Sequence, residues 1–276
     1  MKISFTTMAT PELDGPAAIR MAQAYGYDGI DLRVSPHSGE LTVDSAAADI
    51  AEIKTALANE GIDCASLFCY NDCGNEEAAS WQKMMDSVCK QLEIAEAVGA
   101  EAIRVFTGAP FDTAQAESFF RRTAETLAAA ACKMPSDIRI LIQNHSQNAT
   151  AAESAFVANA AGNPRIGIAF SPEHCVIQGQ DPFAQLETVF PYTPQLYIAD
   201  MCKTADGFTD AFPGEGVVPL PGILAAAVNK GFDGWITFKW ERVWRRELAA
   251  AEIALPAFIP YINGLLQGIS NETLLS

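Results

Sequence analysis

Eight short segments rich in apolar and β-branched residues recur along the chain, alternating with longer segments that are rich in alanine or amphipathic. This alternation predicts repeated strand–helix units, because each helix returns the chain so that the next strand runs parallel to the last. Eight such units within 276 residues match the size of a closed barrel. We therefore expect an α/β protein whose single domain, residues 1–276, is a (β/α)8 TIM barrel. The strands are expected at Lys2–Thr7, Gly29–Val34, Asp63–Cys69, Ala102–Thr107, Ile138–Asn144, Arg165–Ser171, Gln195–Asp200 and Trp235–Trp240.

The helical segments carry their own end signals. Gly26, Gly61 and Gly99 follow three of these segments directly, where a left-handed C-cap is expected. No linker or low-complexity tract interrupts the series, which favours one domain over two. Expected helices include Pro16–Tyr25, Ser45–Glu60, Glu77–Val98 and Thr113–Lys133.

Composition excludes several classes of partner. A net charge of −16, without any cluster of Lys and Arg, argues against a nucleic-acid partner. We find no segment that is both apolar and long enough to cross a bilayer, and the start MKISFTTMATPEL suggests a first strand rather than a secretory signal. Seven cysteines without a CxxC pair indicate reduced thiols. We expect a cytoplasmic protein without a membrane partner.

Barrel active sites are built from the C-terminal ends of the strands and the loops that follow them. Polar residues at those ends are therefore the candidates for chemistry. They are Asp31, Arg33, Arg104, Gln143, Asn144, His145, Ser171, His174, Asp200, Lys239 and Glu241.

The strand ends read QNH, FSPEH, YIAD and KWE, and the chain also contains GYDGIDLR, PGEGVVPLPGIL, GFDGWITFKWE and ALPAFIPYINGLL. In this order the segments resemble the xylose isomerase-like family of sugar isomerases and epimerases, whose corresponding strand ends read like EnH, fDpxH, HxKD and ExE. The resemblance covers essentially the whole chain. It implies a (β/α)8 barrel, a small carbohydrate as substrate, and a divalent Mn, Mg, Co or Zn ion whose two glutamate ligands move protons.

The chain departs from that pattern at all four implied ligand positions. Gln143, Ser171, Tyr197 and Lys239 stand where the family has Glu, Asp, His and Glu. The family set carries a charge of about −3, whereas these four side chains sum to about +1. Divalent ions need anionic oxygen ligands, so we expect no metal cofactor, with the ammonium group of Lys239 in its place.

Three functional hypotheses follow. In the first, desolvation lowers the pKa of Lys239, which attacks or polarises a carbonyl group. An ion pair of Lys239 with Asp200 or Glu241 is the structural alternative. The expected catalytic residues are Lys239, His174, His145 and Glu241, and the expected substrate-binding residues are Gln143, Ser171, Asp200, Arg33, Arg104 and Tyr197.

In the second hypothesis the protein is an inactive carbohydrate-binding partner, with Trp235, Trp240 and Trp244 as a stacking surface, although core packing is more usual for such residues. In the third, a relocated metal site uses ligands from the strand ends, namely His145, His174, Asp200 and Glu241.

Several arginines are also ambiguous in the sequence. Arg33 and Arg104 suit an anionic group of the substrate or a solvated salt bridge. Arg242, Arg245 and Arg246 suit a solvated helix face, and they leave a homo-oligomer contact open.

Overall fold

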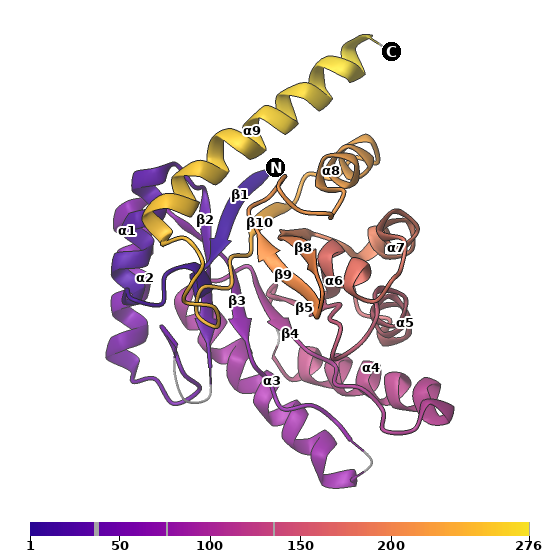
Figure 1. The fold of residues 1–276 in the computed structure, drawn as a ribbon. Helices are drawn as coiled ribbons and strands as arrows, with labels where there is room; N and C mark the ends of the chain where they lie inside the picture. Colours follow the sequence, from indigo (N-terminus) through magenta and orange to yellow (C-terminus); the bar gives the residue numbers. More distant parts are fainter. Residues whose placement is uncertain (36–38, 76, 135, 276) are drawn as a thin grey trace.

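The protein is described by a computed structural model that covers residues 1–35, 39–75, 77–134 and 136–275. Eight parallel strands close into a barrel in the order β1-β10-β7-β6-β5-β4-β3-β2, with helices around it (Figure 1). The predicted (β/α)8 barrel is confirmed, and the strand bounds differ from the predicted ones by no more than two residues. The strands are β1 (Lys2–Thr6), β2 (Gly29–Val34), β3 (Asp63–Cys69), β4 (Ala102–Val105), β5 (Arg139–Gln143), β6 (Ile166–Phe170), β7 (Gln195–Ile198) and β10 (Trp235–Phe238).

The helices largely follow the predicted pattern. Gly26, Gly61 and Gly99 all adopt positive φ angles, of 81°, 64° and 89°, directly after α1, α2 and α3, so the predicted C-caps are confirmed. The α-helices are α1 (Gly15–Tyr25), α2 (Ala47–Glu60), α3 (Ala78–Val98), α4 (Ala116–Lys133), α5 (Ala151–Ala161), α6 (Pro172–Ile177), α7 (Pro182–Val189), α8 (Leu220–Asn229) and α9 (Ala251–Leu275). Short 3-10 helices are η1 (Thr7–Ala9), η2 (Thr113–Gln115) and η3 (Phe190–Tyr192).

One hairpin was not predicted. Strands β8 (Asp200–Thr204) and β9 (Gly207–Ala211) pair antiparallel between β7 and α8, outside the barrel ladder. The sequence rule of one helix after each strand therefore fails here, because β7 is followed by this hairpin before its helix begins.

Two apolar layers stabilise the barrel. The larger layer lies between the strands and the helices, where every second strand residue faces outward. The smaller layer fills the barrel itself and includes Phe68, Leu141, Ala169 and Tyr197. Inward and outward positions alternate along each strand, so residues two positions beyond this inner layer face the barrel mouth.

The last helix corrects one expectation. Residues Ala251–Asn271 of α9 are long and apolar enough to cross a bilayer, contrary to the prediction that no such segment exists. The same helix begins as the outer helix after β10 and then extends past the barrel toward the C-terminus (Figure 1). Phe258 on this helix stacks on Phe238 of β10 at 4.4 Å, which anchors its first half to the barrel. Length and composition alone are weak grounds for a membrane span, since helices of globular cores meet the same criteria.

Candidate active site

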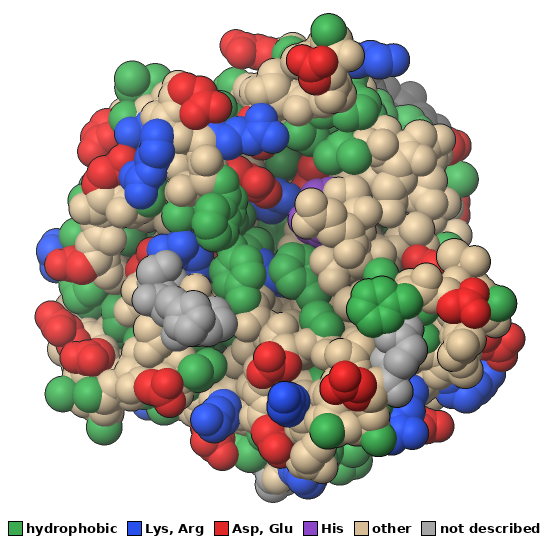
Figure 2. Space-filling view, turned by 60° about the horizontal axis from the view of Figure 1, so that its bottom comes forward, with side chains coloured by type: hydrophobic (Ala, Val, Ile, Leu, Met, Phe, Trp, Pro, Cys, Tyr) green, Lys and Arg blue, Asp and Glu red, His purple; other side chains and the backbone are tan. Residues whose placement is uncertain are grey.

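Strand alternation places five of the predicted residues on one inward face. Arg104, Gln143, Ser171, Tyr197 and Lys239 each stand two positions after an inward residue of their strand, and each is buried. Figure 2 shows this end of the barrel, which is hollowed at its centre, with basic, acidic and histidine side chains close together in the hollow. Because these five residues come from five different strands, only barrel closure brings them to one mouth.

Lys239 is the centre of a buried charged cluster. Its Nζ lies 2.8 Å from Glu173 Oε1 and 3.0 Å from Glu241 Oε1. A third neighbour, His174 Nε2, lies 3.2 Å from the same nitrogen. The contacts with the two carboxylates are ion pairs, and the contact with His174 Nε2 has hydrogen-bond geometry. The predicted ion pair with Glu241 is confirmed, and Glu173 is a partner that the sequence analysis missed.

The carboxylates determine the charge of Lys239. Burial alone would lower the pKa of its ammonium group, but the charges of Glu173 and Glu241 outweigh burial and raise it. The expectation of a lowered Lys239 pKa is therefore wrong. Conversely, the charge of Lys239 lowers the pKa of Glu241, whereas burial raises the pKa of Glu173 in spite of Lys239. Lys239 is thus a protonated cation at neutral pH.

The two predicted histidines lie together beside this cluster. The rings of His145 and His174 are 3.9 Å apart between centroids. Burial and the nearby charge of Lys239 lower the pKa of His145 to about 4 and the pKa of His174 well below its ordinary value. Both imidazoles are therefore neutral at pH 7, and a neutral imidazole can accept a hydrogen bond or donate one.

Gln143 and Ser171 bond to each other across neighbouring strands. Gln143 Nε2 donates to Ser171 Oγ at 2.9 Å, while the amide of Asn144 pairs with the backbone of Ser171 in both directions. Among the residues that the structure describes, Gln143 Oε1 is buried and finds no donor. It is thus an acceptor available to a hydroxyl group.

Asp200 does not lie in this cluster. Its carboxylate accepts four backbone N–H groups, at 2.8 Å from Met201 and 2.9 Å from Gly214, Gly216 and Val218. The expectation that Asp200 orients Lys239 or binds substrate is not supported, because its oxygens are engaged in holding the loop before α8. Asp200 begins β8, where the chain leaves the barrel ladder and the strand alternation no longer applies.

Of the two arginines that were predicted to bind an anion, one has a carboxylate partner and the other has none among the described residues. Arg33 Nε is 3.9 Å from Glu40 Oε2, and both side chains are buried, so this pair is not the solvated salt bridge that was expected as the alternative. Arg104 has no exposed surface and forms no ion pair within the described residues. The rings of Phe68 and Phe106 lie 3.4 and 4.2 Å from its Cζ.

The aromatic and basic residues near the last strand differ in burial and in their partners. Trp235 and Trp240 are core residues, whereas Trp244 is 61% exposed and its ring is 6.4 Å from that of Tyr70. The arginines after Trp240 lie in an irregular segment and not on a helix, contrary to the prediction. They form ion pairs with Glu12 and Asp210, through Arg242, Arg245 and Arg246.

The donor set around Lys239 does not fit a divalent ion. Within the described ranges, no group of three or more His, Cys, Asp or Glu side chains is arranged to hold a metal. Glu173, Glu241 and His174 surround an ammonium group, which would repel a cation. The four relocated ligands proposed from the sequence are likewise not gathered, since Asp200 is committed to backbone amides.

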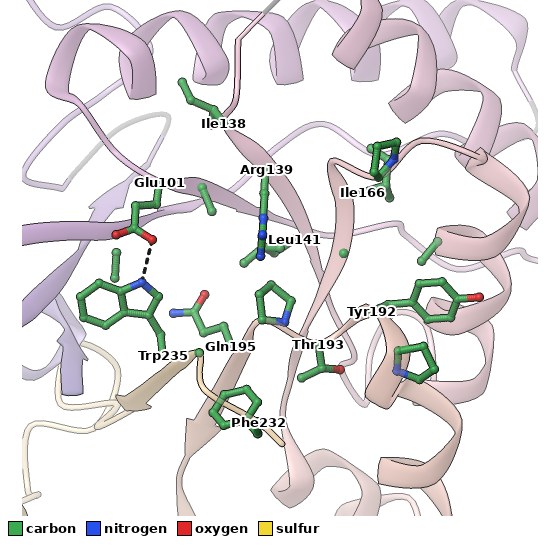
Figure 3. Close-up of a pocket in the computed structure, with 18 of the residues that line it drawn as sticks. Glu101, Ile138, Arg139, Leu141, Ile166, Tyr192, Thr193, Gln195, Phe232 and Trp235 are labelled. Atoms are coloured by element: carbon green, nitrogen blue, oxygen red, sulfur yellow. Dashed lines mark hydrogen bonds between the residues drawn. The ribbon is translucent and has the colours of Figure 1, made fainter. Parts of the chain in front are cut away.

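A cavity of about 1060 Å³ lies at the opposite, N-terminal end of the barrel (Figure 3). Glu101, Arg139, Gln195 and Trp235 point into it, and Trp235 Nε1 donates to Glu101 Oε2 at 3.0 Å (Figure 3). We place the candidate active site at the mouth instead, because the charged cluster with perturbed pKa values lies there and barrel enzymes use that end.

The fold and this cluster together define a closed parallel barrel with buried charged groups at its C-terminal mouth. Residues 19–257 match the family model described as xylose isomerase-like TIM barrel, and the chain belongs to that family. Comparison with curated protein sequences gives no match.

Solved structures agree on the fold. The IOLI protein with a bound zinc atom is 16% identical with a TM-score of 0.78, covering 97% of this chain and 99% of its own. D-psicose 3-epimerase from Clostridium cellulolyticum H10, solved with D-tagatose, is 14% identical with a TM-score of 0.76, covering 96% and 99%. The probable 3-DHS dehydratase AsbF from Bacillus anthracis is 15% identical with a TM-score of 0.71, covering 95% and 99%. At these identities the likeness shows the fold alone.

Proposed function

We propose that this protein catalyses isomerase- or epimerase-type carbonyl chemistry on a small polyhydroxylated carbohydrate, without a divalent metal. The observation that carries the proposal is the Lys239 ammonium group between Glu173, Glu241 and His174 in the barrel mouth. A similar structure was solved with D-tagatose, which is consistent with a ketose as substrate. The metal of such a site would polarise a carbonyl oxygen, and here a fixed cation takes that role.

Lys239 acts as a protonated electrophile. Its raised pKa disfavours the neutral amine that a Schiff base requires. The contact with His174 is the longest of its three and the only one without a carboxylate, so it is the one that a substrate carbonyl oxygen replaces. The ammonium group then donates a hydrogen bond to that oxygen and stabilises the negative charge that develops on it.

Glu241 is the proton acceptor. Its side chain is 26% exposed, against 2% for Glu173, so it is the carboxylate of the pair that faces an incoming ligand. It removes the proton from the carbon next to the carbonyl group, and the released electron pair moves to the carbonyl oxygen as an enediolate. Returning the proton to the former carbonyl carbon, while a proton passes from the adjacent hydroxyl group to the former carbonyl oxygen, gives isomerisation. Delivery of a proton to the other face by a water molecule gives epimerisation, and the proton held by Glu241 neutralises the hydroxide that is left.

The buried amide and hydroxyl groups position the substrate. Gln143 Oε1 is a buried acceptor without a donor among the described residues, and Ser171 Oγ bonds to the same side chain. Both suit hydrogen bonds with sugar hydroxyls, which donate and accept. Glu173 stays buried beside Lys239 and balances its charge.

The test is exchange of substrate carbon-bound hydrogen with deuterated water, followed by NMR over a panel that includes D-fructose and D-tagatose. Protein treated with a chelator should exchange as fast as untreated protein, and Lys239→Met should lose exchange. Lys230→Met is the matched control, because Lys230 pairs with Glu187 on the surface. Exchange that appears only after a divalent metal is added would refute the proposal.

A carbohydrate-binding protein without turnover is the second candidate. It is favoured by the three groups that already surround the Lys239 ammonium group, two of them carboxylates that neutralise its charge. The exposed Trp244, with the partly buried Tyr70 beside it, offers an aromatic surface on which a sugar ring can lie. Carbohydrate binding measured by calorimetry without any deuterium exchange would select this candidate over the first.

A further inference from the structure

Arg104 carries a buried charge that the proposed chemistry does not use. The side chain has no exposed surface, and neither Nε, Nη1 nor Nη2 has a hydrogen-bond partner among the described residues. Burial lowers the pKa of its guanidinium, yet arginine remains charged in proteins. Unpaired buried charges are rare because they forfeit hydration, so an unpaired guanidinium suggests an absent anion.

Another arginine in the same fold shows what a satisfied guanidinium looks like. Arg165 donates to the carbonyl oxygens of Ala131, Met134 and Ile138 and to Ser136 Oγ. Arg104 instead lies against rings, with its Cζ 3.4 Å from Phe68, 4.2 Å from Phe106 and 5.1 Å from Tyr70. The rings of Phe68 and Phe106 attract the cation through their faces but offer no oxygen to its N–H groups. The Tyr197 hydroxyl, which opposes the lowering of the Arg104 pKa, is a neutral phenol and not an anion.

We propose that Arg104 binds a carboxylate of the substrate, so that the substrate is a polyhydroxylated acid and not a neutral sugar. The planar fork of guanidinium N–H groups matches the two oxygens of a carboxylate. A phosphate monoester carries about two negative charges at neutral pH and needs more than one cation. Arg33 already faces Glu40, and Lys239 already faces two carboxylates, so Arg104 alone supplies one unit of charge.

Arg104 and Lys239 both lie near the two histidines, since the charge of each lowers the pKa of His145 and of His174. The ring of Phe106 lies against Arg104 and is 5.1 Å from the ring of His145. The ring of His145 is in turn 3.9 Å from that of His174, which contacts Lys239. The carboxylate then lies at Arg104 and the carbonyl group at Lys239, so this step rests on the proposed function. The Tyr70 ring lies between Arg104, whose Cζ is 5.1 Å away, and the exposed Trp244, whose ring is 6.4 Å away.

The test compares acids with neutral partners of the same carbon skeleton by calorimetry, at constant ionic strength. D-gluconate and D-glucuronate are the acids, D-glucitol and D-glucose are the neutral partners, and D-glucose 6-phosphate is the phosphate probe. At least one acid should bind at least about tenfold more tightly than its neutral partner. Arg104→Gln and Arg104→Met should remove that preference, and Arg104→Lys should retain only part of it because ammonium lacks the fork.

Arg121→Gln is the matched control, because Arg121 pairs with Glu117 on the surface of α4. Since Arg104→Met removes an unpaired buried charge, its thermal midpoint should equal or exceed that of the native protein. Should the variants fail to fold, the comparison of acid and neutral ligand on the native protein still decides. Equal binding of acid and neutral partner, or tighter binding of the phosphate, would overturn the inference.

The outcomes for the two proposals are separable. Arg104-dependent binding of an acid without deuterium exchange would support the carboxylate site and refute the catalytic proposal. Deuterium exchange of a neutral ketose that requires Lys239 but not Arg104 would do the reverse.

Discussion

Lys239 and Glu173 form an ion pair with 2.8 Å between Nζ and Oε1, and their side chains are only 3% and 2% exposed. Lys2 and Asp63 form a pair at the same distance, but at 50% and 54% exposure. We expect Glu173→Leu to lower the free energy of unfolding by about 3 kcal/mol, because it removes one of the two carboxylates that balance the buried ammonium group.

Asp63→Ala should lower the free energy of unfolding by less than about 1 kcal/mol, because water and salt screen an exposed pair. Urea denaturation of both variants measures the difference. Equal losses in the two variants would contradict the buried character of the Lys239 pair.

Removing the ammonium group should create a metal site. In Lys239→Ala the three acceptors Glu173 Oε1, Glu241 Oε1 and His174 Nε2 would surround a point that now lies 2.8 to 3.2 Å from each. Zinc bonds to such atoms are about 2.0–2.2 Å, so an inward shift of about 1 Å completes the site. We expect Lys239→Ala to bind one Zn²⁺ by elemental mass spectrometry and calorimetry.

The control is Lys239→Ala combined with Glu241→Gln, which should lose most of this zinc affinity. Native protein should bind no stoichiometric Mn, Mg, Co or Zn at this position. A single tightly bound ion in native protein that Glu241→Gln removes would contradict metal-independent chemistry.

His145 should make stability fall in acid. Its pKa is lowered to about 4 in the folded protein, against about 6.5 in the unfolded chain. The unfolded state therefore binds the proton more readily than the folded state. The contribution of neutral His145 to the free energy of unfolding is fully present above pH 6.5 and is lost as pH falls toward 4. At 1.36 kcal/mol per unit this contribution is about 3 kcal/mol. His145→Phe should abolish it, and NMR titration of the imidazole should show no protonation at pH 5.5.

Asp31 should act with the opposite sign. Burial raises its pKa to about 6, although Ser66, Ser4 and Gln195 donate to its carboxylate. The folded state holds this proton more tightly than the unfolded chain, so stability declines as pH rises from about 4 to about 6. Between pH 4 and 6 the two groups oppose each other. In Asp31→Asn the free energy of unfolding should rise more steeply with pH, because only the His145 contribution is left. In His145→Phe it should fall with pH, because only the Asp31 contribution is left. Parallel pH profiles for the two variants would contradict both assignments.

Asp200 should matter for the loop before α8 and not for chemistry. Asp200→Asn places an amide where four backbone N–H groups converge, which should cost about 1–3 kcal/mol of unfolding free energy. Hydrogen exchange at the Gly214 and Gly216 amides should accelerate. Asp206→Asn, on the exposed turn of the β8–β9 hairpin, is the control. Loss of deuterium exchange in the substrate with normal amide protection would instead assign Asp200 to the active site.

The sequence by itself determined the barrel. Strand and helix periodicity depends on neighbours a few residues away, so strands such as Gly29–Val34 and Asp63–Cys69 and caps such as Gly26 were predicted with little error. The same alternation placed Gln143, Ser171 and Lys239 at one mouth. It failed at Asp200, where the chain leaves the ladder and side-chain direction is no longer set by strand geometry.

Only the tertiary structure decided the charge, the pKa and the hydrogen-bond partners of those residues. Glu173 contacts Lys239 from the first turn of α6, 66 residues earlier in the chain, and that carboxylate with Glu241 turns an expected lowering of the lysine pKa into a rise. Glu173 had a local signal, the FSPEH segment that contains it, but nothing local showed which way it points. The role proposed for Arg104 likewise depends on the lack of hydrogen-bond partners for its guanidinium among the described residues. Charge, burial and hydrogen bonding depend on everything within a few ångströms, and barrel closure brings those groups from distant positions in the chain.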